Sequence, residues 1–328
     1  MTSAETQFTE DHAEGSGITG VRVGIFAPVG QFSSSVEQRE ALLTEIADSG
    51  VDHVCVGDHV SFQVGAGADA LIDATSLLTH YAEMPCYVAL YLLPLRHPVL
   101  VARQLASIAE LAPGRLTFGV GIGGEDPHEL EICGVDPRTR GRRMDESLQI
   151  LRELSEGKPV SFDGEFFTLR DAQILPAPSS PIRIVVGGRS VAAVRRAGRF
   201  GDGWLGIWVS PQRFGSVVTQ IAEHAAHAGR DPSRFEHAIN VWCGFGPSRD
   251  AARAPLAAGM QHFYQMPFEP FERYSPYGTP EDVAEFLYPY IEAGCSAFNV
   301  IPCANDHETA VRAVAELRQL LTAAGDYT

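Results

Sequence analysis

The segment VLVARQLASIAELAPGRLTFGVGIGG covers residues 99–124 and joins a helix-type stretch to a strand-type stretch. In residues 99–111 the apolar side chains recur every three or four positions, which is the pattern of an amphipathic helix. After the turn residues Pro113 and Gly114 comes the apolar run 116–120, whose length suits a buried strand. The segment therefore predicts one helix–strand unit of an α/β protein.

The same alternation extends along the rest of the chain. Eight short apolar runs predict strands, at residues 21–27, 51–56, 87–93, 116–120, 182–186, 204–207, 239–243 and 297–301. Amphipathic stretches that predict helices lie between them, at residues 37–48, 99–111, 142–154, 191–199, 212–227, 280–293 and 308–321. Continuous apolar strands that alternate with helices are parallel and covered on both faces, and eight of them favour a closed (β/α)8 TIM barrel. A doubly wound open sheet is the alternative.

Two longer connections predict insertions into this barrel. Residues 161–169, after the fourth helix, carry Asp163-Gly164 between β-forming residues, which is typical of a tight hairpin. Residues 244–279, after the seventh strand, include the aromatic and proline-rich stretch 263–277, which we interpret as a lid or a substrate wall. Residues 1–20 are polar and aperiodic, so we expect a flexible tail followed by a single barrel domain over residues 21–328.

Composition and charge exclude several functional classes. The 25 Lys and Arg residues against 41 Asp and Glu residues give a net charge of -16, which opposes binding to nucleic acids and anionic membranes. No apolar run reaches the roughly 18 residues of a membrane-spanning helix, and the N-terminus lacks a signal-peptide pattern, so we expect a cytoplasmic protein. The six cysteines contain no Cys-x-x-Cys pair and no His-x-His follows the first strand, so we expect free thiols and no metal site. The only lysine, Lys158, lies in a turn-like stretch, which argues against Schiff-base chemistry.

The end of the second strand offers the first candidates for catalysis, because reacting groups in a barrel follow the strand ends. This strand runs into Gly57-Asp58-His59, which places an imidazole that titrates near neutral pH at the barrel mouth. We expect His59 to be catalytic, and a histidine that only orients a loop is the equal alternative. Asp58 is a second catalytic candidate, although an acid beside glycine is also typical of a turn or a helix cap.

Glycine-rich stretches follow the fourth and fifth strands. Residues 119–124, among them Gly121 and Gly123, leave the strand end without side chains, so a flat ring can lie against the backbone there; a tight turn is the alternative. The fifth strand ends in Gly187, Gly188, Arg189 and Ser190. Ser190 suits a helix N-cap, and the free amides of that helix together with Arg189 suit an anion such as a phosphate. An ordinary glycine-rich turn is the alternative.

Several longer stretches together resemble the luciferase-like flavin-dependent family over residues 21–323. They are LPLRHP (93–98), LAPGRLTFGVG (111–121), RGRRMDE (140–146), GGRS (187–190) with Ala197-Gly198, and GDGW (201–204). Their combined order is more specific than any single stretch. The resemblance implies an oxidoreductase built on a (β/α)8 barrel that needs no structural metal and binds either FMN or the deazaflavin coenzyme F420.

The resemblance favours the F420-dependent branch, because Gly57-Asp58-His59 is similar to the Ser-Asp-His triplet of deazaflavin-using members. It implies hydride transfer between F420 and a small organic substrate, with His59 as proton donor or acceptor. It also implies a non-prolyl cis peptide bond between Ala89 and Leu90 behind the cofactor ring, a cofactor phosphate on residues 187–190, and a homodimer. An FMN-dependent monooxygenase and a non-catalytic flavin-binding barrel are the alternatives.

Two further expectations concern the pocket that the resemblance implies. Some deazaflavin dehydrogenases use a glutamate after the fourth strand, and in this chain Gly124 stands at that position with Glu125 beside it. The aromatic residues expected to line the pocket are Phe62, Tyr91, Trp208 and Trp242.

Overall fold

The computed structural model describes residues 20–27, 35–63, 65–124 and 126–325. Eight parallel strands form the centre of this part of the chain: β1 (Arg22–Phe26), β2 (His53–Val56), β5 (Cys86–Leu92), β6 (Leu116–Gly121), β9 (Arg183–Gly187), β10 (Gly203–Ile207), β11 (Glu236–Phe245) and β13 (Ala297–Cys303). They are hydrogen-bonded in the order β10-β9-β6-β5-β2-β1-β13-β11, and the pairing of β10 with β11 closes the ring. The predicted TIM barrel is therefore confirmed, and each predicted strand coincides with one of the eight. The expected tail falls almost wholly outside the described residues.

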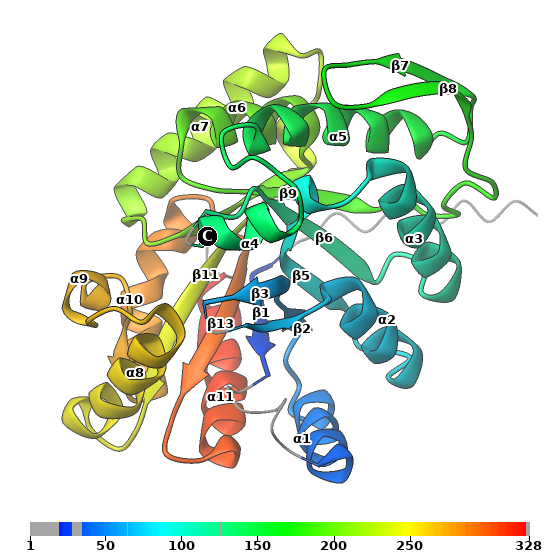
Figure 1. Cartoon of the computed structure of the whole chain (residues 1–328). Coiled ribbons are helices and arrows are strands. Elements are labelled where there is room, and N and C mark those ends of the chain that lie inside the picture. The colour runs from blue at the N-terminus through cyan, green and yellow to red at the C-terminus, as the bar shows by residue number, and fades with distance from the viewer. Residues whose placement is uncertain (1–19, 28–34, 64, 125, 326–328) are drawn as a thin grey trace, which may run out of the picture.

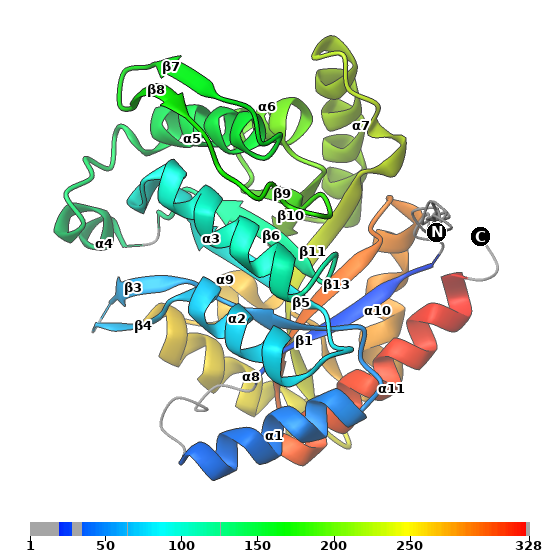
Figure 2. The same ribbon diagram turned by 90° about the vertical axis from the view of Figure 1, so that its right-hand side faces the viewer.

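A ring of helices surrounds the strands, as Figures 1 and 2 show. Its members are α1 (Val36–Asp48), α2 (Ala70–His80), α3 (Pro98–Leu111), α5 (Arg140–Leu154), α6 (Val191–Phe200), α7 (Pro211–His227), α10 (Pro280–Glu292) and α11 (His307–Gly325). All seven predicted helices are present, and α2 is an addition to them. Among the helices that the structure describes, none combines the length and the apolarity needed to traverse a lipid bilayer.

Smaller elements decorate the ends of the barrel. Both predicted insertions contain regular structure: β7 (Val160–Asp163) and β8 (Thr168–Ala172) form an antiparallel hairpin, and α8 (Arg249–Tyr264), α9 (Glu269–Glu272) and β12 (Tyr277–Gly278) follow β11. The remaining elements are β3 (His59–Phe62), β4 (Ala66–Ala68), α4 (Pro127–Ile132), and the short 3-10 helices η2 (Leu93–Leu95) and η3 (Pro232–Arg234). The β3–β4 hairpin and α4, which the sequence did not predict, both lie beside the candidate site.

The apolar core has two main layers. The larger layer lies between the strands and the helix ring, and the smaller one fills the barrel with Cys55, Tyr87, Ala89, Val185, Leu205, Ala238 and Ala297. A third cluster around Trp242 and Met260 anchors α8 and α9 to the barrel. All six cysteines are free and five of them are buried, as expected of small apolar side chains. No group of three His, Cys, Asp or Glu residues within the described ranges is arranged to hold a metal ion.

Candidate active site

His59 begins β3 at the end of the second barrel strand, and its partner is a carboxylate on α4. The imidazole Nδ1 lies 3.1 Å from Oε2 of Glu129, a residue that is 2% exposed. The backbone amides of Val60 and Ser61 also donate to Oε1 of Glu129, at 2.6 and 3.2 Å. Burial raises the pKa of Glu129, but the hydrogen bonds from His59 and from these amides outweigh burial and hold that pKa below its usual value.

An ionised Glu129 fixes the protonation pattern of His59. A carboxylate can only accept hydrogen bonds, so His59 donates from Nδ1. Nε2 is then the nitrogen that remains for another molecule, and the side chain is 26% exposed. This arrangement of an oriented imidazole with one free nitrogen is suited to proton transfer. Sequence reasoning missed Glu129, because the 70 positions that separate it from His59 carry no periodic signal.

Asp58 points away from this pair. It is 2% exposed, and both of its oxygens accept from the Arg96 guanidinium, at 2.6 and 2.8 Å. The backbone amides of Leu92 and Ala70 donate to the same carboxylate. Desolvation nevertheless raises the pKa of Asp58, with Arg96 acting in the opposite direction. Through these contacts Asp58 links the end of β5 and the start of α2 to the end of β2. The catalytic role expected for Asp58 stays a prediction.

The glycine stretch after β6 faces the side chain of Leu90. The Ala89–Leu90 peptide bond is cis, as the resemblance implied, and it coincides with a bulge-like shift in the pairing register of β5 and β6. A Cβ atom placed on Gly187 would lie 2.2 Å from Leu90 Cδ1, and one on Gly121 would lie 2.9 Å from it. These glycines thus make room for Leu90, which lies between β6 and β9. Gly123 has a φ of +68°, which favours glycine in the turn that leads to α4.

The turn from β9 into α6 has the features of an anion site. Ser190 caps α6, as predicted, and its Oγ accepts from the Ala193 amide at 3.2 Å. Gly188 has a φ of +121°, and its carbonyl accepts a 2.7 Å hydrogen bond from the indole of the buried Trp204. Arg189 is exposed and lies 5.4 Å from the ring centre of Trp208. The helix dipole favours a negative group here, and so does Arg189, which has no carboxylate partner among the residues that the structure describes.

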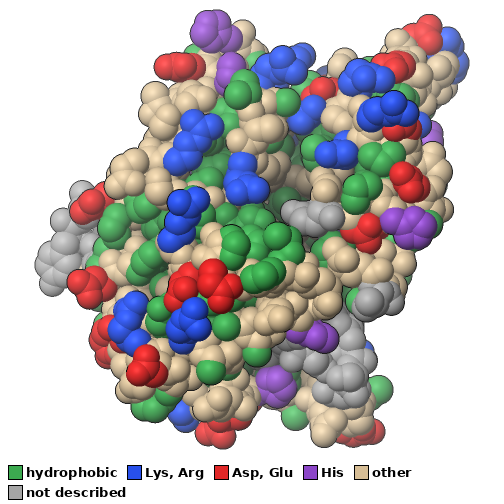
Figure 3. Space-filling view, turned by 60° about the vertical axis from the view of Figure 1, so that its left-hand side comes forward, with side chains coloured by type: hydrophobic (Ala, Val, Ile, Leu, Met, Phe, Trp, Pro, Cys, Tyr) green, Lys and Arg blue, Asp and Glu red, His purple; other side chains and the backbone are tan. Residues whose placement is uncertain are grey.

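A continuous line of ring contacts joins His59 to this turn. Ring centres are separated by 6.2 Å between His59 and Phe263, 4.9 Å between Phe263 and Tyr264, and 5.0 Å between Tyr264 and Trp208. Trp208 then contacts Arg189. Residues from β3, α8 and the ends of β10 and β9 therefore border one mouth. Figure 3 shows hydrophobic and basic side chains around a hollow on the side that carries α8 and α9.

Three of the four predicted aromatic residues belong to this wall. Phe62 lies 4.3 Å from the His59 ring centre, Trp242 donates to the Tyr264 hydroxyl at 3.3 Å, and Trp208 is in the line of contacts. Tyr91 lies elsewhere, since it is 1% exposed in the outer core, with its ring under Arg96. The irregular pairing of β5 at residues 89–90 places Tyr91 on the helix side of the strand. Glu125 lies outside the described residues.

Polar side chains form a column inside the barrel beneath the mouth. His53 Nε2 donates to Oδ1 of Asn299 at 2.7 Å, Asn299 Nδ2 donates to Oδ1 of Asn240 at 3.0 Å, and Asn240 Nδ2 donates to the Ala89 carbonyl at 3.4 Å. Burial lowers the pKa of His53 to about 4, so this imidazole is neutral at physiological pH. Gly24 provides the space for it, because an added Cβ would lie 2.1 Å from the ring.

A barrel with its polar groups gathered at the carboxyl ends of the strands defines an α/β-barrel enzyme architecture. The sequence profile of the luciferase-like monooxygenase family matches residues 21–285, and the chain belongs to this family, whose members are oxidoreductases.

Relatives and solved structures agree with this assignment. An uncharacterised protein of Mycobacterium tuberculosis is 39% identical over 150 residues, which are 45% of this chain and 51% of that protein, so the match spans about half of that relative. An F420-dependent glucose-6-phosphate dehydrogenase of Beutenbergia cavernae is 31% identical over 242 residues, covering 71% of this chain and 70% of that enzyme. The structure of an F420-dependent secondary alcohol dehydrogenase in complex with an F420-acetone adduct superposes with a TM-score of 0.77 at 22% identity, covering 92% of this chain and 99% of that one.

Proposed function

We propose that this protein is an F420-dependent oxidoreductase that transfers a hydride between the cofactor and a small organic substrate. The observation that carries the proposal is the His59–Glu129 pair, which shares one mouth with the anion-favouring turn at Ser190. The similarity to an F420-dependent dehydrogenase at 31% identity over 71% of the chain favours F420 over FMN. A homodimer and a cytoplasmic location stay predictions.

The residues at the mouth fit a cofactor that carries a phosphate. The amides at the start of α6, the dipole of this helix and the Arg189 guanidinium would hold the phosphate. The aromatic wall of Phe62, Phe263 and Trp208 would exclude water from the reacting atoms. The cis-linked backbone at Ala89 and Leu90, with the column beneath it, would lie behind the ring.

When bound, F420 supplies a carbon centre that accepts or releases a hydride. The protein's part is the matching proton: His59 Nε2 takes a proton from a substrate hydroxyl during oxidation, or returns one to a substrate carbonyl during reduction. Glu129 holds the imidazole orientation and stabilises the positive charge that His59 gains in the first case. Glu129 does not need to reach the substrate for this role.

Titration of the purified apoprotein with F420 and with FMN tests the proposal. We expect F420 to bind with a change in its absorbance band, and FMN to bind at least about tenfold more weakly. His59→Ala should keep its affinity for F420 while turnover with an accepted alcohol or carbonyl substrate falls by about 10²-fold or more.

Three results would contradict parts of this proposal. Preferred binding of FMN together with oxygen-dependent product formation identifies a monooxygenase instead. Tight F420 binding without turnover on a panel of alcohols and carbonyl compounds identifies a cofactor-binding barrel without catalysis. Unchanged turnover in His59→Ala removes His59 from the mechanism.

A further inference from the structure

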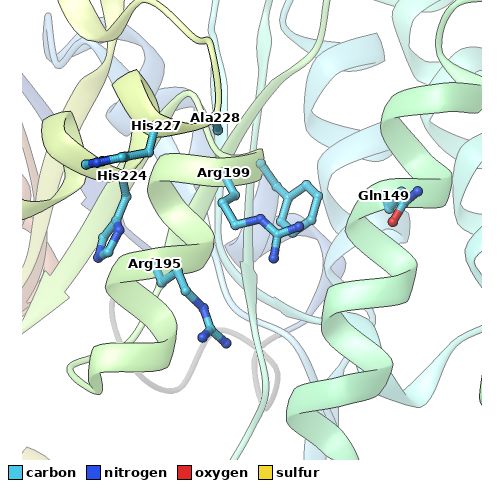
Figure 4. A pocket seen from close by; sticks show the side chains of 7 residues that line it. Gln149, Arg195, Arg199, His224, His227 and Ala228 are labelled. Atoms are coloured by element: carbon cyan, nitrogen blue, oxygen red, sulfur yellow. The ribbon is translucent and has the colours of Figure 1, made fainter.

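A second hollow lies on the outside of the barrel, between α5, α6 and α7. It has a volume of about 590 Å³ and is lined by Gln149, Arg195, Arg199, Phe200, His224, His227 and Ala228. Figure 4 shows the two arginines on α6 and the two histidines on α7 around this space, with Gln149 across from them on α5. None of the lining residues is acidic, although the chain as a whole carries a net charge of -16.

The positive charge of the two arginines is not neutralised within the described part of the protein. Arg195 is exposed and has no ion pair or hydrogen bond there, and the contact of Arg199 is with the Phe200 ring at 4.9 Å. Arg196, on the same helix, shows the opposite situation, because it is buried and its guanidinium donates to Asp145 at 2.6 Å. The charge of Arg195 and Arg199 is therefore available to a ligand.

Local packing brings the two helices close enough to share this space. A Cβ on Gly198 would lie 2.5 Å from His224 Cβ, so the glycine permits the close approach of α7. The four-residue spacing of the arginines and the three-residue spacing of the histidines each place one pair on one helix face. Arg152 donates twice to the Phe200 carbonyl, at 2.8 and 2.6 Å, and thereby fixes the end of α6.

We propose that this groove binds a small polyanion that carries two or more phosphate or carboxylate charges. Guanidinium groups bind both anions through paired hydrogen bonds, and two of them four residues apart can hold two anionic groups or two oxygens of one group. Arg199 and the histidines lie in the last turns of their helices, where cations also offset the negative helix end. Arg195 lies one turn earlier, so the helix end does not account for it.

The groove is separate from the mouth. Ser190 caps the start of α6 at the mouth, and Arg195 and Arg199 lie five and nine residues later, which corresponds to about 7 and 13 Å along a helix. A single phosphate group therefore cannot contact both the amides at Ser190 and Arg199, and binding at the two sites can be separated by mutation.

Calorimetric titration of the purified full chain with pyrophosphate and with citrate tests this inference. We expect at least one of these two anions to bind, and the R195Q/R199Q variant to bind it at least about tenfold more weakly than the unchanged protein does. Added salt should also weaken this binding. Arg213→Gln is the matched control, because it removes an exposed arginine from the other end of α7. This control should leave binding unchanged. The R189Q variant removes the arginine at the mouth and so tests whether the anion binds there instead.

The outcomes separate cleanly. Loss of binding in R195Q/R199Q but not in the Arg213 control supports the groove, and the probe that binds tells whether phosphate or carboxylate groups are preferred. Binding that is lost in R189Q and kept in R195Q/R199Q belongs to the mouth and overturns the inference. Equal binding by all variants, or no binding of either probe at about 10 mM, overturns it too.

Discussion

The carboxylate of Glu129 determines which nitrogen of His59 carries a proton. Glu129 is anchored by two backbone amides of β3, so its oxygens have little freedom to turn away from the imidazole. The carboxylate accepts from His59 Nδ1, which leaves Nε2 as the nitrogen that can contact another molecule. A neutral amide at position 129 would preserve the shape of the pair and remove the negative charge.

We therefore expect Glu129→Gln to lower turnover by roughly tenfold or more, because the imidazole loses the carboxylate that orients it and stabilises the charge that it gains during proton transfer. The affinity for cofactor should stay unchanged. The measurement is kcat and KM for the substrate with saturating cofactor. Glu131→Gln is the control, since Glu131 lies on the same helix, is exposed and is 3.8 Å from His128. A kcat that does not fall in Glu129→Gln would show that Glu129 takes no part in the proton transfer.

The ion pair of Asp58 and Arg96 leads to a prediction about stability. Asp58→Ala leaves the largely buried Arg96 guanidinium with only the 3.5 Å contact to Asp69 and the Leu92 carbonyl, so it should reduce the free energy of unfolding by about 3 kcal/mol. Asp163→Ala, in an exposed pair with Arg170, should cost less than about 1 kcal/mol. Urea unfolding followed by circular dichroism compares the two. Equal costs would contradict the structural role of Asp58.

At the scale of elements, the strands and most helices could be predicted because burial determines which positions are apolar. A helix buried on one side repeats apolar residues every three or four positions, and a strand buried on both faces is a continuous apolar run. The run at 116–120 and its seven counterparts are covered on both faces, which keeps them apolar throughout. The β3–β4 hairpin carries no such signal, since β4 is Ala66–Ala68 and is largely exposed. Its turn contains Gln63 with a φ of +50°. The turn lacks the Asn-Gly pair that is typical of a tight hairpin, so the sequence did not predict it.

The candidate site was predictable only in part, for a similar reason. Residues that follow a strand directly, such as His59 and Ser190, can be assigned to the mouth from the order of elements. Glu129 lies on the six-residue helix α4, beyond the glycine stretch, and its contact with β3 depends on how that loop folds back. Tyr91 was misplaced because the bulge at residues 89–90 interrupts the alternation of faces along β5.

Strand β1 gives a test of packing inside the barrel. Gly24→Ala should destabilise the protein by about 1–3 kcal/mol, because the new methyl group would overlap the His53 ring. Gly57→Ala is the control, since the nearest neighbour of its new methyl group would be the Phe26 side chain at 4.0 Å. Thermal unfolding of both variants is the measurement. A Gly24→Ala protein as stable as the control would mean that His53 can leave its position at little cost.

At the scale of the whole molecule, we expect the free energy of unfolding to fall in mild acid because two histidines are buried in the folded protein. Burial lowers the pKa of His53 and that of His237 from 6.5 to about 4. The unfolded chain therefore binds these two protons first as the pH falls, and the free energy of unfolding should decrease between about pH 6.5 and pH 4. Each histidine contributes a slope of up to about 1.4 kcal/mol per pH unit.

Urea unfolding at several pH values measures this slope. The His53→Gln and His237→Gln variants should each show a shallower dependence on pH, whatever their absolute stability. His128→Gln is the control, because His128 is exposed on α4. The same slope in all four proteins would show that neither buried histidine governs the acid response.

The column from His53 through Asn299 and Asn240 to the Ala89 carbonyl has a direction. Each side chain in it donates to the next, from His53 to the Ala89 carbonyl, so the hydrogen bonds run head to tail and their dipoles reinforce one another. The electric field beneath any ring bound at the mouth is therefore partly set by residues that never touch it. Replacement of the Asn240 amide in this column should therefore change the reduction potential of such a ring without a change in the residues that contact it.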